Sequence, residues 1–412
     1  MRKSVIAAVV LAPVSWVWAA EGERPIHVES FLRLGWDDNV TWAAKNKVDS
    51  FFIREELALS LDKTYDTGFI GLRYRPALDW YENYGKDSKA EWSHGVDLNW
   101  YQALSRRFTV GISETFLVYD RSEVVDSDGV LRQPNYGYKY NTAAATLTAL
   151  LTPKLRLSGS LRNQLFRYDD EGLAAIHDFD IWSYGLSFGT QVGKTTTVYL
   201  DGSIDDISYT KAGEPRQVHV PGYRDPIIDE VPNRDSLTYF AGLGIEQVFS
   251  PNLLGRLRGG YTYKDMEAAN QSNDSAPYGE AALTIIPVPT TRLTLAASYS
   301  LYQSGLATFA SQTRTTFSAS LAHDLTARIT LSVIGTYFIS EYDAENSVDL
   351  LDPTGVRDGE ESAATVTARA SYRLDRNNWL DVGYTFSRFD SDFQTREAVE
   401  RNRVDVGWRI RL

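Results

Sequence analysis

The chain has no cysteine and only two methionines among its 412 residues. Without cysteine, no disulfide can stabilise the fold and no thiolate can act as a nucleophile or a metal ligand. After its N-terminal segment, the chain has no run of roughly 18 apolar residues, the length that a membrane-spanning helix requires. With a mean hydropathy of −0.31, the composition is not that of a helical membrane protein.

Features of an enzyme or a metal protein are also scarce. There are five histidines, and none stands in a sequence that resembles the Ser-His-acid site of an outer-membrane lipase or protease. The acidic segment from Glu341 to Glu361 could ligate calcium, but it lacks the spacing of a calcium loop. We therefore expect no catalytic residues, no metal site, no cofactor and no nucleic-acid partner.

The N-terminus has the features of a secretory signal peptide. Arg2 and Lys3 precede an apolar run from Val5 to Val14, and Val17-Trp18-Ala19 fits a cleavage site after Ala19. The apolar run is too short to be a spanning helix. We expect residues 1–19 to be removed, residues 20–412 to form a single domain, and the protein to be exported from the cytoplasm.

Strict alternation of apolar and polar residues dominates the rest of the chain. The last stretch shows it clearly: Val404, Val406, Trp408, Ile410 and Leu412 alternate with Asp405, Gly407, Arg409 and Arg411. A strand with this period presents one set on each face. A membrane β-barrel turns the apolar face to lipid, and the 24 Tyr, 10 Trp and 17 Phe would form its interfacial girdles.

The connections between these segments predict the topology. Eight short turns, such as Leu104 to Arg107, strictly alternate with nine longer polar loops, such as residues 41–50. They imply 18 antiparallel strands, with 16 as the alternative, in an all-β, up-and-down transmembrane barrel of a Gram-negative outer membrane. In such barrels the short turns face the periplasm and the long loops face outward.

The predicted inward face is rich in arginine. We expect the substrate path to include five arginines, and a periplasmic vestibule to include seven more. The path residues are Arg33, Arg73, Arg75, Arg162 and Arg369; the vestibule residues are Arg156, Arg256, Arg258, Arg292, Arg373, Arg409 and Arg411. Arg54 also faces inward. The inward acids are Glu56, Asp79, Asp97, Asp201, Glu246, Asp381 and Asp405.

Two interpretations of this inward face remain open. The arginines and acids could pair into a neutral ladder across the wall, or the excess of arginine could form a path for anions. Two local features are also undecided. The 211–235 loop could fold inward to narrow the pore or stay on the surface, and Glu114 would face lipid unless a β-bulge near Gly111 or Ser113 shifts the register.

The first predicted strand carries the sequence Leu34-Gly35-Trp36-Asp37-Asp38-Asn39-Val40, followed by a loop and a Phe-rich strand. In this, and in its size, the chain resembles outer-membrane β-barrel porins encoded in bacterial exopolysaccharide biosynthesis and export clusters. The resemblance implies a conduit for a secreted polysaccharide that works with a periplasmic export protein. The alternative is a general or small-anion porin. Either would contact lipid and lipopolysaccharide and require the barrel-assembly machinery, although the chain ends in Leu412 where many such barrels end in Phe.

Overall fold

A computed structural model describes residues 25–84, 89–121, 136–212, 214–218, 227–231, 233–268, 271–306, 308–346, 357–393 and 397–412. The signal peptide expected at residues 1–19 lies outside these ranges. The alternating segments form 18 long strands of a single sheet. They are β1 (Ile26–Asp37), β2 (Ser50–Tyr65), β3 (Gly68–Tyr81), β4 (Lys89–Ala103), β5 (Phe108–Tyr119), β6 (Tyr138–Thr152), β7 (Leu155–Tyr168), β8 (Phe179–Gln191), β9 (Thr196–Tyr209), β12 (Ser236–Ser250), β13 (Leu253–Met266), β14 (Asp274–Val288), β15 (Thr291–Gln303), β16 (Ser311–Asp324), β17 (Ile329–Tyr342), β18 (Gly359–Arg373), β19 (Asn378–Ser391) and β20 (Val399–Arg411).

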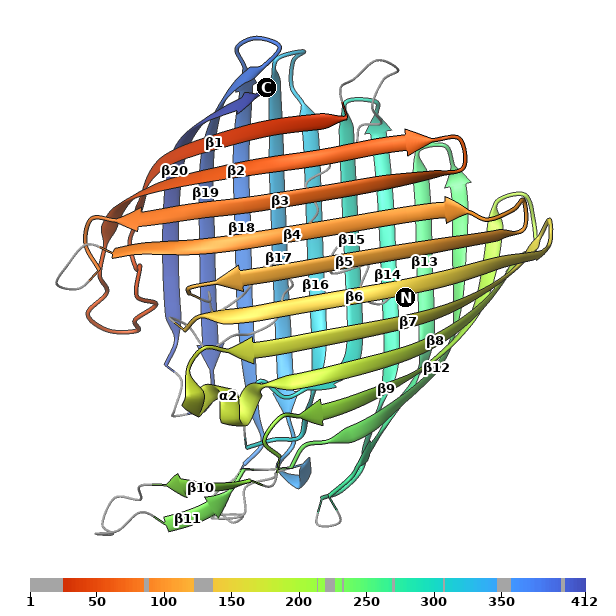
Figure 1. The fold of residues 1–412 in the computed structure, drawn as a ribbon, viewed down its shortest axis with the longest axis vertical. Coiled ribbons are helices and arrows are strands. Elements are labelled where there is room, and N and C mark those ends of the chain that lie inside the picture. The colour runs from red at the N-terminus through yellow and green to blue at the C-terminus, as the bar shows by residue number, and fades with distance from the viewer. Residues whose placement is uncertain are drawn as a thin grey trace.

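The sheet is a closed barrel (Figure 1). Each strand pairs antiparallel with the next along the chain, β9 pairs with β12, and β20 pairs with β1 to close the ring. Closure satisfies the backbone groups of every strand edge, which a sheet in lipid requires because hydrocarbon offers no hydrogen-bond partner. The predicted 18-stranded up-and-down barrel is confirmed.

Short and long connections lie at opposite ends of the barrel. The short turns, such as residues 66–67 and 251–252, lie at the end where β1 starts and β20 ends. The other end carries the long loops, which hold α2 (Glu171–His177), the 3-10 helix η1 (Ala344–Asn346) and a hairpin of β10 (Pro215–Val218) and β11 (Ile227–Glu230). By the general rule for these barrels, the end with the long loops faces outward.

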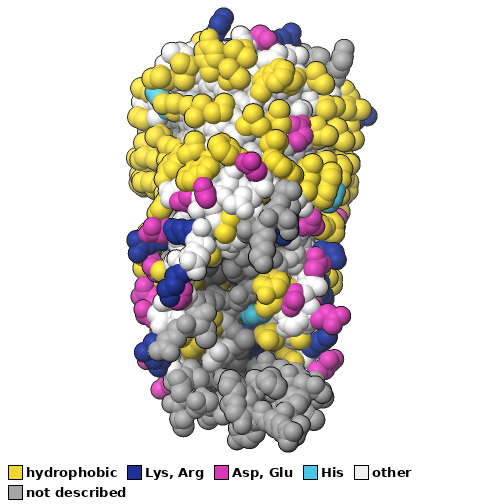
Figure 2. All heavy atoms as spheres, turned by 90° about the vertical axis from the view of Figure 1, so that its left-hand side faces the viewer, with side chains coloured by type: hydrophobic (Ala, Val, Ile, Leu, Met, Phe, Trp, Pro, Cys, Tyr) yellow, Lys and Arg dark blue, Asp and Glu magenta, His cyan; other side chains and the backbone are white. Residues whose placement is uncertain are grey.

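Large apolar side chains cover a broad part of the outer surface (Figure 2). On β8, for example, Trp182, Tyr184 and Leu186 are 43%, 52% and 60% exposed, which would be unusual on a soluble protein. Ser183 and Ser187, at the alternate positions of the same strand, face inward. Among the described helices, none is long and apolar enough to cross a membrane.

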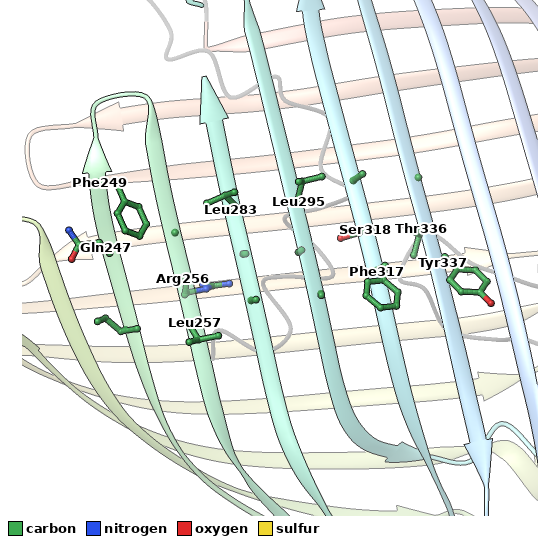
Figure 3. A pocket seen from close by; sticks show the side chains of 18 of the residues that line it. Gln247, Phe249, Arg256, Leu257, Leu283, Leu295, Phe317, Ser318, Thr336 and Tyr337 are labelled. Atoms are coloured by element: carbon green, nitrogen blue, oxygen red, sulfur yellow. The ribbon is translucent and has the colours of Figure 1, made fainter. Parts of the chain in front are cut away.

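The outer wall also has a hollow of about 1150 Å³ over β12 to β18 (Figure 3). Small residues at its base, such as Ala297, Ala319 and Gly335, lie between larger ones, such as Phe317 and Tyr337. These residues occupy the outward positions of their strands, so the hollow faces hydrocarbon rather than the lumen.

Glu114 faces outward in the structure. The pairing of β5 with β4 and β6 runs without a bulge through Gly111 and Ser113, so no shift of register turns this carboxylate inward. Asn141 donates a hydrogen bond of 3.0 Å to it. The β-bulge considered from the sequence is therefore absent, and the Glu114 carboxylate faces outward.

Candidate functional site in the lumen

One side of the lumen, here called the paired wall, is the inner face of β18–β20 and β1–β4. Its arginines and acids alternate with lipid-facing residues and lie opposite one another across the strands. The ion pairs are Arg33–Glu56 (3.3 Å), Arg54–Asp79 (2.6 Å), Arg75–Asp97 (2.8 Å), Arg369–Asp405 (3.1 Å) and Arg409–Asp381 (3.5 Å). On this wall most positive charge is therefore compensated, as the ladder interpretation expects.

An aromatic ring lies at the centre of this wall. The guanidinium carbons of Arg33, Arg369 and Arg409 lie 4.6, 5.4 and 5.9 Å from the centroid of Phe31. Cations stack favourably on aromatic faces. Each of the three arginines also keeps its own carboxylate partner, so the cluster holds the strands of the closing seam together.

The adjoining part of the lumen, here called the hydroxyl wall, is the inner face of β5–β8. Its inward residues are mainly serine and threonine, such as Thr142, Ser158 and Ser160, which are half-buried. Two arginines stand among them. Arg162 donates to Ser183 Oγ at 3.0 Å, and Arg156 donates to Tyr199 Oη at 3.5 Å.

Neither arginine of the hydroxyl wall forms an ion pair with a carboxylate among the described residues. The nearest inward carboxylate in register is Asp205 on β9, and Ser183 lies between it and Arg162. Both guanidinium groups are half-buried and keep N–H groups available to a solute. The same residue type thus lies in two different settings within one lumen.

The other predicted site residues are dispersed. Arg256 and Arg258 pair with Glu280 and Asp201 at 2.7 and 2.6 Å. The other four predicted arginines do not come together in one site. Arg73 lies half-buried opposite Asp97, Arg292 is exposed, Arg373 donates to Ala327 O at 2.9 Å, and Arg411 lies 3.9 Å from Glu29.

The loop of residues 38–49 enters the outer mouth of the lumen. Asp37, fully buried, accepts hydrogen bonds from Arg401 Nε at 3.0 and 2.9 Å and lies 3.6 Å from Arg403. Asn39 donates to Ala43 O and Glu400 O at 2.9 and 3.0 Å. The Asp-Asp-Asn sequence at the end of β1 therefore fixes the loop to β20.

This loop packs against the inner wall rather than projecting outward. Trp42, with φ of 51° and 5% exposed, packs against Phe338, Phe389 and Val399, all inward residues of β17–β20. Val40 packs on Phe52 and Tyr81. In contrast, the hairpin β10–β11 of the 211–235 loop projects away from the outer end of the barrel (Figure 1).

A buried arginine supports the loop from the far side. Arg121 donates to Val40 O at 2.6 Å and to Tyr81 Oη at 3.0 Å, and it pairs with Glu91 at 3.2 Å. Burial would lower the pKa of Arg121, but its electrostatic interactions with Tyr81 and the Glu91 carboxylate outweigh burial and raise that pKa. The guanidinium therefore stays charged beneath the loop.

Aromatic rings form a row across the outer ends of β5–β9. The centroids of Tyr119 and Tyr138 are 5.3 Å apart, and those of Tyr138 and Phe166 are 5.2 Å apart. Leu173 and Ala174 of α2 pack against this row. Tyr138 and Phe166 are only 1% and 2% exposed, so α2 covers them.

With this geometry in place, comparison with known proteins identifies the family. The profile of one family, described as Putative beta-barrel porin 2, matches residues 28–412. The chain belongs to this family. It is an outer-membrane β-barrel porin, and its closed barrel with a polar lumen is that of a channel. No curated protein matches this porin.

Three of the solved structures that the chain resembles are porins of Pseudomonas. The porin shares 11% identity and a TM-score of 0.47 with OccK2 (OpdF) of Pseudomonas aeruginosa, over 94% of this chain and 98% of that one. It shares 12% identity and a TM-score of 0.47 with OpdK of the same species, crystallised with vanillate, over 94% of this chain and 99% of that one. With a BenF-like porin from Pseudomonas fluorescens Pf-5, the identity is 11% and the TM-score is 0.47, over 94% of this chain and 98% of that one.

Several site residues of the porin were not predicted. Arg401 and Arg403 continue the inward positions of Arg409 and Arg411, so the same alternation could have identified them. Trp42 and Arg121 gave no such signal, because they lie in loops whose direction the sequence pattern does not specify. No group of three metal-ligating side chains occurs among the described residues.

Proposed function

We propose that this porin is a diffusion channel for small anionic solutes. The observation that carries the proposal is the hydroxyl wall, where Arg156 and Arg162 face the lumen without an ion-pair partner among the described residues. Guanidinium groups bind carboxylates and phosphates through charge-assisted hydrogen bonds. Hydroxyl side chains around them can replace part of the hydration shell of a passing solute without a large energetic cost.

The outer mouth supports a small solute. The 38–49 loop lies within the mouth and is held by the buried Asp37–Arg401 pair. A constriction made of packed residues admits solutes by size and charge. The expected substrate path is therefore narrower outside than at the periplasmic end, where Arg156 and the other vestibule arginines lie.

The rival function is secretion of an exopolysaccharide with a periplasmic export protein, which the family resemblance implied. Aromatic rings could bind sugar rings on their flat faces. Yet the largest aromatic row in the described mouth, around Tyr138 and Phe166, is covered by α2. A polymer would also need the 38–49 loop to leave its packed position, so the small-solute function has the better support.

Two measurements test the proposal. In planar bilayers under a salt gradient, the reversal potential of the wild-type channel should show preference for anions; cation preference would contradict it. Deletion of the gene should leave surface polysaccharide unchanged and slow the entry of a small anion. Loss of surface polysaccharide with polymer retained in the cell would instead support the secretion function.

A further inference from the structure

Two cations are buried together at the outer end of β12 and β13. Arg234, directly before β12, and Lys264, on the inner face of β13, are each only 1% exposed. They lie close enough for their charges to repel each other. Burying one charge without a counter-ion costs several kcal/mol by order of magnitude, so this pair of cations requires an explanation.

The direct partners of both cations are neutral. Lys264 Nζ donates to Gln303 Oε1 at 2.7 Å and to Ala310 O at 2.9 Å, which accounts for two of its three N–H groups. Arg234 donates to Ile176 O and stacks on Tyr209, 4.2 Å from its ring centroid. The hydroxyl of Tyr209 donates to the same Gln303 oxygen at 3.4 Å, so the two cations belong to one network.

Two carboxylates lie nearby without neutralising the cations directly. Asp274 is opposite Lys264 in register, but its oxygens accept from Ser311 Oγ and from the Ser275 backbone. Asp235 accepts from the Tyr209 backbone at 2.6 Å and is influenced by Asp206 on the outward face. Neither lies within ion-pair distance of Arg234 or Lys264 among the described residues; Asp274 attracts Lys264 and Asp235 attracts Arg234 only at longer range.

Unused hydrogen-bond donors surround the two cations. Arg234 Nη1 is buried and has no partner among the described residues, and the same holds for three hydroxyls of the adjacent strands. By register Thr238 lies directly opposite Lys264 and Ser236 lies diagonal to it, while Thr262 precedes Lys264 by two residues on the same face of β13. Together with the third N–H of Lys264, these are five donor groups without a hydrogen-bond partner among the described residues.

We propose that Arg234, Lys264 and these hydroxyls bind a small tetrahedral oxyanion at the outer mouth: free phosphate or sulfate, or that group on a small solute. Five donors exceed what the two oxygens of a carboxylate use in common geometries, whereas four oxygens can accept them all. The near-complete burial of both cations excludes a polymer as the occupant. Binding here does not depend on the anion selectivity proposed above, since it involves neither Arg156 nor Arg162.

The test is direct titration of the purified, folded barrel in detergent. Sodium sulfate and sodium phosphate are titrated by calorimetry, with sodium chloride at matched ionic strength as the blank and sodium acetate as the carboxylate probe. We expect saturable binding of sulfate and phosphate, and clearly weaker binding of acetate. Arg234→Gln and Lys264→Gln should each weaken sulfate affinity about tenfold or more, because a charge-assisted hydrogen bond is lost.

Two variants keep the result interpretable. Arg388→Gln removes an exposed arginine of the same end of the barrel and should leave sulfate affinity unchanged. Thr238→Val keeps both cations and should weaken affinity severalfold, so it tests the site even if loss of a cation prevents folding. Absence of saturable binding to wild type, equal affinity for acetate, or unchanged affinity in Arg234→Gln would overturn the proposal. Binding with normal affinity in a channel that proves cation-selective would uphold this site and refute only the proposed conduction.

Discussion

Arginine has different surroundings on the paired wall and on the hydroxyl wall. On the paired wall, Arg75 lies 2.8 Å from Asp97 and Arg369 lies 3.1 Å from Asp405. On the hydroxyl wall, Arg156 and Arg162 donate hydrogen bonds to hydroxyl groups, and Arg156 also lies over the ring of Tyr199. An arginine that faces a lumen is therefore not by itself part of an anion path; its cross-strand neighbour decides.

The difference follows from register. A carboxylate opposite or diagonal to an arginine on the next strand lies within reach of it. Arg369 reaches Asp405 two strands away because only Gly383 lies between them, whereas Ser183 lies between Arg162 and Asp205. The net basic interior that composition suggests thus divides into a largely neutral region that links strands and a smaller region where positive charge remains available. Four sets of variants test how the neighbours of a charged side chain decide its role, beginning with the largest expected effect.

Asp37→Asn should have the largest effect. It removes the buried carboxylate that is hydrogen-bonded to Arg401 and lies 3.6 Å from Arg403, and breaking such a buried pair costs about 3–5 kcal/mol. The 38–49 loop should then leave the inner wall, so single-channel conductance should rise and thermal unfolding should shift to lower temperature. Asp49→Asn is the matched control, because Asp49 is exposed at the other end of the loop and its carboxylate accepts a hydrogen bond from Trp36 Nε1 at 3.4 Å. Unchanged conductance in Asp37→Asn would show that the loop does not narrow the pore.

The second test compares the loss of stability in Arg258→Gln, which removes an arginine with an ion-pair partner, with that in Arg156→Gln, which removes one without such a partner among the described residues. Arg258 and Asp201 have side chains only 6% and 13% exposed and lie 2.6 Å apart, so loss of the guanidinium strands a buried carboxylate at a cost of about 3 kcal/mol. Arg156→Gln leaves no carboxylate behind and should cost less than about 1 kcal/mol. Guanidinium-induced unfolding followed by tryptophan fluorescence measures both. Equal losses would mean that the two arginines do not differ in role.

The third test addresses ion selectivity. The double variant Arg156→Gln/Arg162→Gln removes charge without exposing an acid, and should lower the anion-to-cation permeability ratio by up to about fivefold, the scale of one unscreened charge at close range in water. Arg75→Gln/Asp97→Asn is the control, since it removes a neutral pair from the paired wall and should leave the reversal potential unchanged. The opposite pattern would assign the anion path to the paired wall.

Most of the fold was predictable from sequence because a barrel strand must alternate and its connections must alternate in length. Positions such as Trp182 and Ser183, or Val406 and Asp405, take their faces from a period of two that the membrane enforces. The inward direction of Arg33 or Arg162 follows in the same way. Their partners do not, since the partner depends on which residue of the next strand stands opposite.

The outer mouth was less predictable for a different reason. The sequence drew attention to the 211–235 loop, the longest of the outer loops, as a possible constriction. Instead, the shorter outer loop of residues 38–49 enters the lumen. Its direction depends on a buried carboxylate bonded to Arg401, 364 positions away. Periodicity carries no information on such a contact, because loop residues have no face.

The last test compares a carboxylate on the outer surface with one in the lumen, and its expected effect is the smallest. Glu114 faces outward between Leu98 and Ala143 with Asn141 as its hydrogen-bond partner, whereas Asp201 faces inward with Arg258. A charged side chain on the lipid face of a barrel is unfavourable, for acids by less than the few kcal/mol found for cations. Glu114→Leu should therefore stabilise the barrel by about 1 kcal/mol in lipid vesicles, and Glu114→Gln by less. Unfolding in urea from vesicles measures this difference. If Glu114→Leu destabilises the protein instead, the carboxylate must have a polar partner in the membrane beyond Asn141, and this part of the outer wall would be a contact surface rather than a lipid-facing one.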